Sequence, residues 1–103
     1  MGKIAVVTGA SKGIGRACAL RLAKDGMTVV VNYSHSDAEA AKTVEEIKAA
    51  GGDAVAYKAD VSDLNQVKDM FKFVSDTYGR VDILVNNAGI VRDEYLLMLT
   101  QEN

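Results

Sequence analysis

A glycine-rich stretch near the amino terminus constrains this chain more than any other feature. The apolar run at residues 4–7 leads into Gly9, Gly13 and Gly15, and a segment with helical periodicity follows. Glycine permits tight turns and lets backbone N–H groups approach an anion, while the start of the next helix adds its positive dipole end. The spacing Gly-x-x-x-Gly-x-Gly differs from the commonest dinucleotide fingerprint. Strand, glycine loop and helix in this order predict a phosphate-binding loop, and an ordinary turn is the alternative.

The apolar pattern of the whole chain predicts strands that alternate with helices. We expect strands at residues 4–7, 27–31, 54–57 and 81–85, with a polar loop at 32–36. The first helix runs from Gly13 to about Asp25, the second follows a cap at Ser36 or Asp37, and the third follows a cap at Ser62. The expected buried faces of the helices carry Ile14, Ala17, Cys18 and Leu22, then Ala40, Val44 and Ile47, then Leu64, Val67, Phe71, Val74 and Tyr78.

This alternation predicts an α/β fold, a Rossmann-like doubly wound parallel sheet of about four strands and three main helices. Right-handed crossovers place helices on both faces of such a sheet. A nucleotide site at the first strand favours the strand order 3-2-1-4, with the ligand at the switch between strands 1 and 4. We expect residues 1–103 to form a single dinucleotide-binding domain.

Composition argues against several other classes of protein. The net charge is −2, and lysines and arginines are scattered among acids, so we expect no nucleic-acid partner. No apolar run approaches the ~20 residues that span a bilayer, so we expect no membrane partner and a cytoplasmic location. Cys18 is the single cysteine and His35 the single histidine, which predicts a packed thiol and no metal site.

Three short motifs in order resemble those of the short-chain dehydrogenase/reductase family. They are Thr8-Gly9-Ala10-Ser11-Lys12-Gly13-Ile14-Gly15, Asp60-Val61 and Asn86-Asn87-Ala88-Gly89. The resemblance runs from Lys3 to about Gln101. Within the family, residues 81–90 are most similar to the 3-oxoacyl-acyl-carrier-protein reductases of fatty acid synthesis, and the acetoacetyl-CoA reductases are close behind.

The resemblance implies a dinucleotide site. Its pyrophosphate and adenosine ribose would be surrounded by Gly9, Ser11, Gly13, Ile14 and Gly15. Adenine would meet Asp60 and Val61, and the path to the nicotinamide ribose would be lined by Asn87, Ala88 and Gly89. A carboxylate can accept a hydrogen bond from the exocyclic amine, although Asp60 could equally brace the turn before the third helix. For Asn86 we favour a structural role, tying the fourth strand to its neighbour.

The residues after the second strand favour NADP(H) over NAD(H). A ribose diol is bound by a carboxylate at this place, whereas a 2′-phosphate needs cations or neutral hydrogen-bonding groups. Asn32, Tyr33 and Ser34 stand there and no acid does. Lys12 in the glycine loop could reach the phosphate as a point charge, or could simply be a solvated lysine.

The catalytic Ser and Tyr-x-x-x-Lys that the resemblance implies do not occur, so we assign no catalytic residue. The residues four positions after the tyrosines are Asp37, Val61, Asp82 and Leu99. We therefore expect the chain to be the amino-terminal, cofactor-binding part of a longer reductase, whose substrate the sequence does not identify. A stand-alone nucleotide-binding module and a structural fragment without ligand are the alternatives.

We also expect the chain to form homo-oligomers. A sheet that ends at residues 81–85 leaves that strand as an edge, with Asp82 as its single charge. The apolar run at residues 96–99 adds a second surface to cover. Two copies could pair edge to edge across a two-fold axis, or the run could fold back over the edge.

The 103-residue chain alone should show no reductase activity. Positioning a cofactor does not replace a proton donor at the substrate carbonyl oxygen. Incubation with NADPH and an acetoacetyl thioester should leave the absorbance of the reduced nicotinamide unchanged. An NADPH-oxidising activity that copurifies with the protein would contradict this prediction, and Tyr95 would then be the first acid to test.

Overall fold

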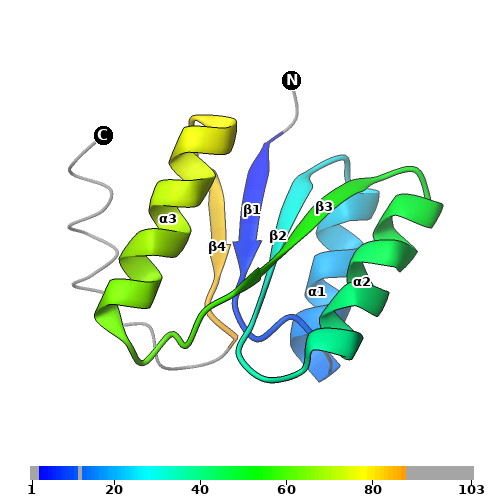
Figure 1. Ribbon diagram of the computed structural model, residues 1–103. Helices are drawn as coiled ribbons and strands as arrows, with labels where there is room; N and C mark the ends of the chain where they lie inside the picture. Colours follow the sequence, from blue (N-terminus) through cyan, green and yellow to red (C-terminus); the bar gives the residue numbers. More distant parts are fainter. Residues whose placement is uncertain (1–2, 12, 88–103) are drawn as a thin grey trace.

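The computed structural model describes residues 3–11 and 13–87 as a parallel sheet with helices on both faces (Figure 1). The strands are β1 (Ile4–Val7), β2 (Thr28–Tyr33), β3 (Asp53–Lys58) and β4 (Ile83–Val85). The helices are α1 (Gly13–Lys24), α2 (Asp37–Ala49) and α3 (Leu64–Tyr78). The order across the sheet is β3-β2-β1-β4, which confirms the predicted α/β class and strand order.

Strand β1 lies in the interior of this sheet and pairs with a strand on each side. Val6 stands opposite Val30 of β2 and Leu84 of β4, with both pairings parallel. Ala5, Val6 and Val7 are completely buried. A short continuous apolar run suits a parallel strand that is covered on both faces. The glycine loop therefore follows the most enclosed strand of the described sheet.

Two apolar layers hold the helices to opposite faces of the sheet (Figure 1). On one face, Val6 and Val30 pack with Met70 and Val74 of α3. On the other, β-branched residues of the neighbouring strands pack with the alanines of α1 and with Ile47 of α2. Successive residues of a strand point to opposite faces, so each strand contributes to both layers. None of the helices within the described ranges is long and apolar enough to cross a membrane.

The buried face of α1 differs from the predicted one. The structure buries Gly15, Ala19 and Ala23, whereas Ile14 is 76% exposed. Ala17 is exposed, and Cys18 and Leu22 are only partly buried. Small residues at intervals of four let the helix approach the strands closely, so the larger apolar side chains lie at the margins of the contact. On α2, Thr43 is buried where Val44 was expected, because it faces the glycine loop.

Several strand boundaries also differ from the prediction, by two residues at the end of β2 and at the start of β4 and by one residue elsewhere. Strand β2 extends through Asn32 and Tyr33, because these residues pair with Tyr57 and Lys58 of β3. Backbone groups that bond to the Asn32 amide make the burial of this polar side chain possible. Strand β4 begins at Ile83, two residues later than expected. The Asp82 carboxylate accepts the Ile4 N–H at 2.8 Å in place of a strand carbonyl. The Arg80 guanidinium, and after it the Ile4 N–H, hold the pKa of Asp82 below its usual value.

Helix α3 is capped by Asp63, so the prediction of Ser62 as the cap is wrong. The Asp63 carboxylate accepts the N–H groups of Asn65 at 2.9 Å and Gln66 at 3.4 Å. The Gln66 side-chain nitrogen also donates to the Asp63 carboxylate, at 3.1 Å. Ser62 bonds to Asp60 instead. The helix ends at the predicted Gly79, whose φ of 80° is a left-handed conformation that glycine adopts readily.

Asp63→Ala should lower the free energy of unfolding by about 1 kcal/mol, since it removes the acceptor for two orphan N–H groups. Ser62→Ala is the matched control and should cost less, because Ser62 caps no helix in the structure. Urea denaturation followed by circular dichroism measures both variants. A larger loss for Ser62→Ala would contradict the assignment of the cap.

Candidate functional site

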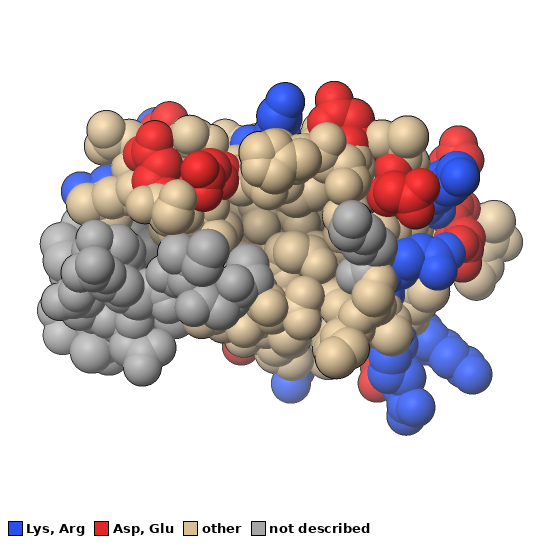
Figure 2. Space-filling model, turned by 90° about the horizontal axis from the view of Figure 1, so that it is seen from below, with Lys and Arg blue, Asp and Glu red and all other residues tan. Residues whose placement is uncertain are grey.

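The carboxyl ends of the four strands bring the predicted loops to one edge of the sheet. Gly9 follows β1, Asn32 lies near the end of β2, Asp60 follows β3 and Asn87 follows β4. In open parallel sheets this edge is where ligands bind. Figure 2 shows it from below, with residues that are neither acidic nor basic in the middle of the face and charged side chains nearer its rim.

The glycine loop depends on a close approach between backbone groups. A Cβ on Gly15, in the first turn of α1, would lie 2.2 Å from the Gly9 carbonyl oxygen and 2.6 Å from Nδ2 of Asn87. No side chain fits in that space. Gly9 and Gly13 have φ values of 61° and 64°, which favour glycine for a different reason. The first turn of α1 contains no acidic residue, so the positive end of the helix is not neutralised locally.

The loop after β4 is tied directly to the glycine loop. Asn87 Nδ2 donates to the Gly9 carbonyl at 3.0 Å, and the Thr8 N–H donates to the Val85 carbonyl at 3.0 Å. The Thr8 hydroxyl lies 3.5 Å from Asn86 Oδ1. This last contact agrees with the structural role favoured for Asn86. The two loops that flank the predicted switch point are therefore held together by side-chain amides and a buried threonine.

Asp60 is an exposed carboxylate held in a defined turn. Its Oδ1 accepts the Ser62 hydroxyl at 2.6 Å and the Ser62 N–H at 2.9 Å. These two bonds, the hydroxyl first, hold the pKa of Asp60 below its usual value, so it is ionised at neutral pH. Asp60 thus braces the turn, as one of the two hypotheses for it states, and also presents negative charge at the site. Val61 is 5% exposed, and its side chain packs in the apolar layer beneath α3.

The remaining predicted residues differ in how the structure places them. Ser11 is 7% exposed and Ser34 partly buried, while the exposed Ile14 side chain stands at the start of α1. Asn32 does not lie in a polar loop: it is 2% exposed, and its Oδ1 accepts the Gly9 N–H at 3.3 Å. Its contact with a cofactor stays a prediction. Lys12, Ala88 and Gly89 lie outside the described residues, as do Tyr95 and the apolar run at 96–99.

Thr43 of α2 is a residue of this site that sequence reasoning missed. It is completely buried, and its hydroxyl lies 3.4 Å from the Ser11 carbonyl oxygen and 3.5 Å from that of Ala10. The Glu39 carbonyl, one turn earlier, is a third acceptor within reach of the single hydroxyl proton of Thr43, at 3.1 Å. The signal was its position on the same helical face as Ala40 and Ile47, where a polar residue needs a partner.

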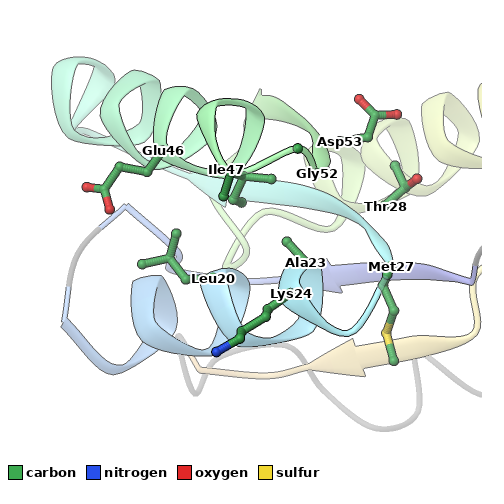
Figure 3. A pocket seen from close by; sticks show the side chains of 12 residues that line it. Leu20, Ala23, Lys24, Met27, Thr28, Glu46, Ile47, Gly52 and Asp53 are labelled. Carbon is green, nitrogen blue, oxygen red and sulfur yellow. The ribbon is translucent and has the colours of Figure 1, made fainter.

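A groove of about 680 Å³ lies elsewhere, between α1 and α2 and at the start of β2 and β3 (Figure 3). Leu20, Ala23 and Ile47 form apolar parts of its lining. It contains none of the residues predicted for the site. Within the described ranges, no group of His, Cys, Asp or Glu could hold a metal ion. The carboxyl edge instead gathers N–H groups, hydroxyls, amides and one carboxylate, which suit an anionic nucleotide.

Comparisons with known proteins agree with this geometry. The family model of the short chain dehydrogenases matches residues 3–103. The 3-oxoacyl-acyl-carrier-protein reductase FabG of Staphylococcus aureus is 51% identical over 102 residues, which are 99% of this chain and 42% of that protein. The 3-oxoacyl-acyl-carrier-protein reductase of Synechocystis is 50% identical over 101 residues, or 98% of this chain and 41% of that protein.

A solved structure shares the fold. The dehydrogenase/reductase from Sinorhizobium meliloti superimposes with a TM-score of 0.81 at 43% sequence identity, covering 84% of this chain and 34% of that one. The chain thus spans about two fifths of the curated relatives described above.

Gly15→Ala should lower the free energy of unfolding by about 3 kcal/mol, because the new methyl group overlaps the Gly9 carbonyl and neither backbone can move freely. Gly13→Ala is the matched control. No atom lies within 4 Å of a Cβ there, so the strain of its positive φ should cost about 1 kcal/mol. Chemical denaturation of both variants checks this. An equal loss for the two would show that steric overlap at Gly15 is not the dominant effect.

Proposed function

The chain belongs to the short-chain dehydrogenase family, and from that premise we propose that it holds the NADP(H) of an oxidoreductase. The proposed substrate is a 3-oxoacyl thioester, because curated relatives named as such reductases are about half identical along nearly the whole chain. Since the chain covers 42% of one such relative, the activity of the whole protein is part of the proposal.

The observation that carries the proposal is the close approach at Gly15. A Cβ there would lie 2.2 Å from the Gly9 carbonyl oxygen and 2.6 Å from Asn87 Nδ2, so only a residue without a side chain lets the start of α1 lie against the loop. Such a loop at the start of α1 fits a pyrophosphate, because N–H groups and the positive helix end face the same anion. In the proposal the loop residues Gly9, Ser11, Gly13 and Gly15 hold the pyrophosphate, and the exposed Ile14 side chain packs beside the adenosine ribose.

The Asp60 turn would hold the adenine. An ionised carboxylate accepts a hydrogen bond from the exocyclic amine, and Ser62 keeps Asp60 ionised and oriented. The Val61 side chain is buried, so Val61 would meet the ring mainly through its backbone. Asn87, with Ala88 and Gly89, would lie along the nicotinamide ribose. Asn87 already donates to the Gly9 carbonyl, which links the two halves of the site.

A preference for NADP(H) follows from the charges near the end of β2. No carboxylate stands there to bind a ribose diol, and Asn32 turns its amide toward the glycine loop. In the proposal Ser34 and Lys12 bind the 2′-phosphate, by a neutral hydrogen bond and a point charge respectively.

The chemistry that NADPH supplies when bound is hydride transfer to a carbonyl carbon. The residues described here bind and orient, since no tyrosine of this chain has a lysine four positions later. We further propose residues 1–103 as one cofactor-binding unit that acts in the cytoplasm, consistent with its single cysteine. Association of copies through β4, which ends the described sheet, is also part of the proposal.

Titration of the purified chain with NADPH and with NADH tests the proposal. NADPH should bind at least about tenfold more tightly, since hydrogen bonds to a charged group contribute about 1.5–3 kcal/mol and 1.4 kcal/mol is a factor of ten. Lys12→Glu should remove most of this difference. Lys48→Glu, an exposed lysine at the far end of α2, is the control and should not. Equal or tighter binding of NADH would contradict the NADP(H) assignment, and no binding of either would contradict the cofactor site.

A further inference from the structure

Asn32 is a buried polar residue of β2 whose side chain bonds to the loop after β1 and to the end of β3. Its side-chain oxygen accepts the Gly9 N–H at 3.3 Å, and its side-chain nitrogen donates to the carbonyls of Ala59 at 3.2 Å and Tyr57 at 3.4 Å. The side chain is 2% exposed. We infer that Asn32 is a positioning residue, which fixes the glycine loop relative to the Asp60 turn; this inference rests on the proposed function.

The groups around the Asn32 side chain, one donor and two acceptors, match the hydrogen-bonding capacity of an amide. One N–H group points to it from Gly9, and two carbonyl oxygens lie near it from β3 and the residue after it. An amide has one acceptor oxygen and two donor hydrogens, so it satisfies all three groups. A carboxylate would have no proton to donate to the two carbonyls. An apolar side chain at position 32 would form none of the three hydrogen bonds.

This network connects the two halves of the proposed cofactor site. Gly9 begins the loop proposed for the pyrophosphate, and Ala59 immediately precedes Asp60, proposed for the adenine. The Asn32 backbone carbonyl also accepts the Ala10 N–H at 2.9 Å. Asn32 therefore holds the loop at two successive N–H groups while it holds the end of β3. Its effect on the cofactor is exerted through these neighbours, because its own side chain is enclosed.

Two substitutions separate the parts of this role. Asn32→Leu removes every polar contact of the amide. Asn32→Asp keeps the acceptor for Gly9 and loses the donors for Ala59 and Tyr57. Protonation of the new carboxyl group restores one O–H donor and removes the buried charge. Because burial raises the pKa of a carboxyl group, we expect this protonation at a pH of about 5 or above, which is within experimental reach.

The first measurement needs no cofactor. In the 103-residue chain, amide hydrogen exchange by NMR should be at least about tenfold faster at Gly9 in Asn32→Leu. In Asn32→Asp the Gly9 amide should keep more of its protection, while the amide chemical shifts of Ala59 and Asp60 change. Val74→Ala, in the layer beneath α3, is the control for general destabilisation. It should accelerate hydrogen exchange in α3 and leave the exchange rate of the Gly9 amide relative to those of its neighbours unchanged.

The second measurement is the dissociation constant of NADPH. Asn32→Asp should bind about tenfold more weakly than the unmodified chain at neutral pH, as expected for lost hydrogen bonds. Its deficit should shrink several-fold on acidification. Every other titratable group is common to both proteins, so the ratio of the two dissociation constants at each pH isolates residue 32. A purely structural loss, as in Val74→Ala, would show no such pH dependence after correction for the folded fraction.

The outcomes distinguish the two proposals. Unchanged exchange at Gly9 in Asn32→Leu, together with unchanged shifts at Ala59 and Asp60 in Asn32→Asp, would overturn the role of Asn32 whether or not NADPH binds. A pH-independent ratio of dissociation constants would also overturn it. Failure of the unmodified chain to bind NADPH would overturn the proposed function, and the exchange data would still decide whether Asn32 positions the loop.

Discussion

The close approach of α1 to the turn after β1 is the constraint on which the rest of this site depends. Gly15 leaves room for the Gly9 carbonyl, and that carbonyl accepts the Asn87 amide from the loop after β4. A side chain at Gly15 would separate these three segments. The same absence of a side chain leaves backbone N–H groups at the start of a helix available to an anion. One steric condition therefore serves both the packing of the fold and the chemistry of the site.

The enclosed sheet provides the rigid support for that approach. Val6 packs on the face toward α3, and Val7 packs on the face toward α1 and α2. Because the strands are parallel, their carboxyl ends reach one edge together, and the loops there inherit fixed positions from the sheet. Asn32, Thr43 and Asn87 then bond to the glycine loop from β2, α2 and the loop after β4. The loop is thus held on several sides by groups that are themselves fixed.

The parts that sequence reasoning predicted correctly are those determined by local patterns. The run at residues 4–7 has few alternatives to a buried strand, and Gly79 ends α3 because few other residues adopt its left-handed backbone. The motifs that contain Gly9 and Asp60 likewise identified segments that lie at the same edge of the sheet. Hydrophobic periodicity predicted the buried face of α1 less well, because small residues form that face at every fourth position. A hydrophobicity scale gives little weight to alanine and glycine as contact residues.

The order of polar and apolar residues along the chain determined the α/β class, since strands and helices depend on spacing over a few residues. The three short motifs indicated the family, and the nucleotide site that they imply favoured the strand order. The tertiary structure decided which polar side chains face the interior. Asn32 and Thr43 look like surface residues in sequence, but each is enclosed because backbone groups distant in the chain pair with it. Ser62 was the predicted cap of α3, but Ser62 bonds to Asp60 and the neighbouring Asp63 caps the helix. Hydrogen-bond partners that come together through folding are absent from any local pattern, and they fixed these outcomes.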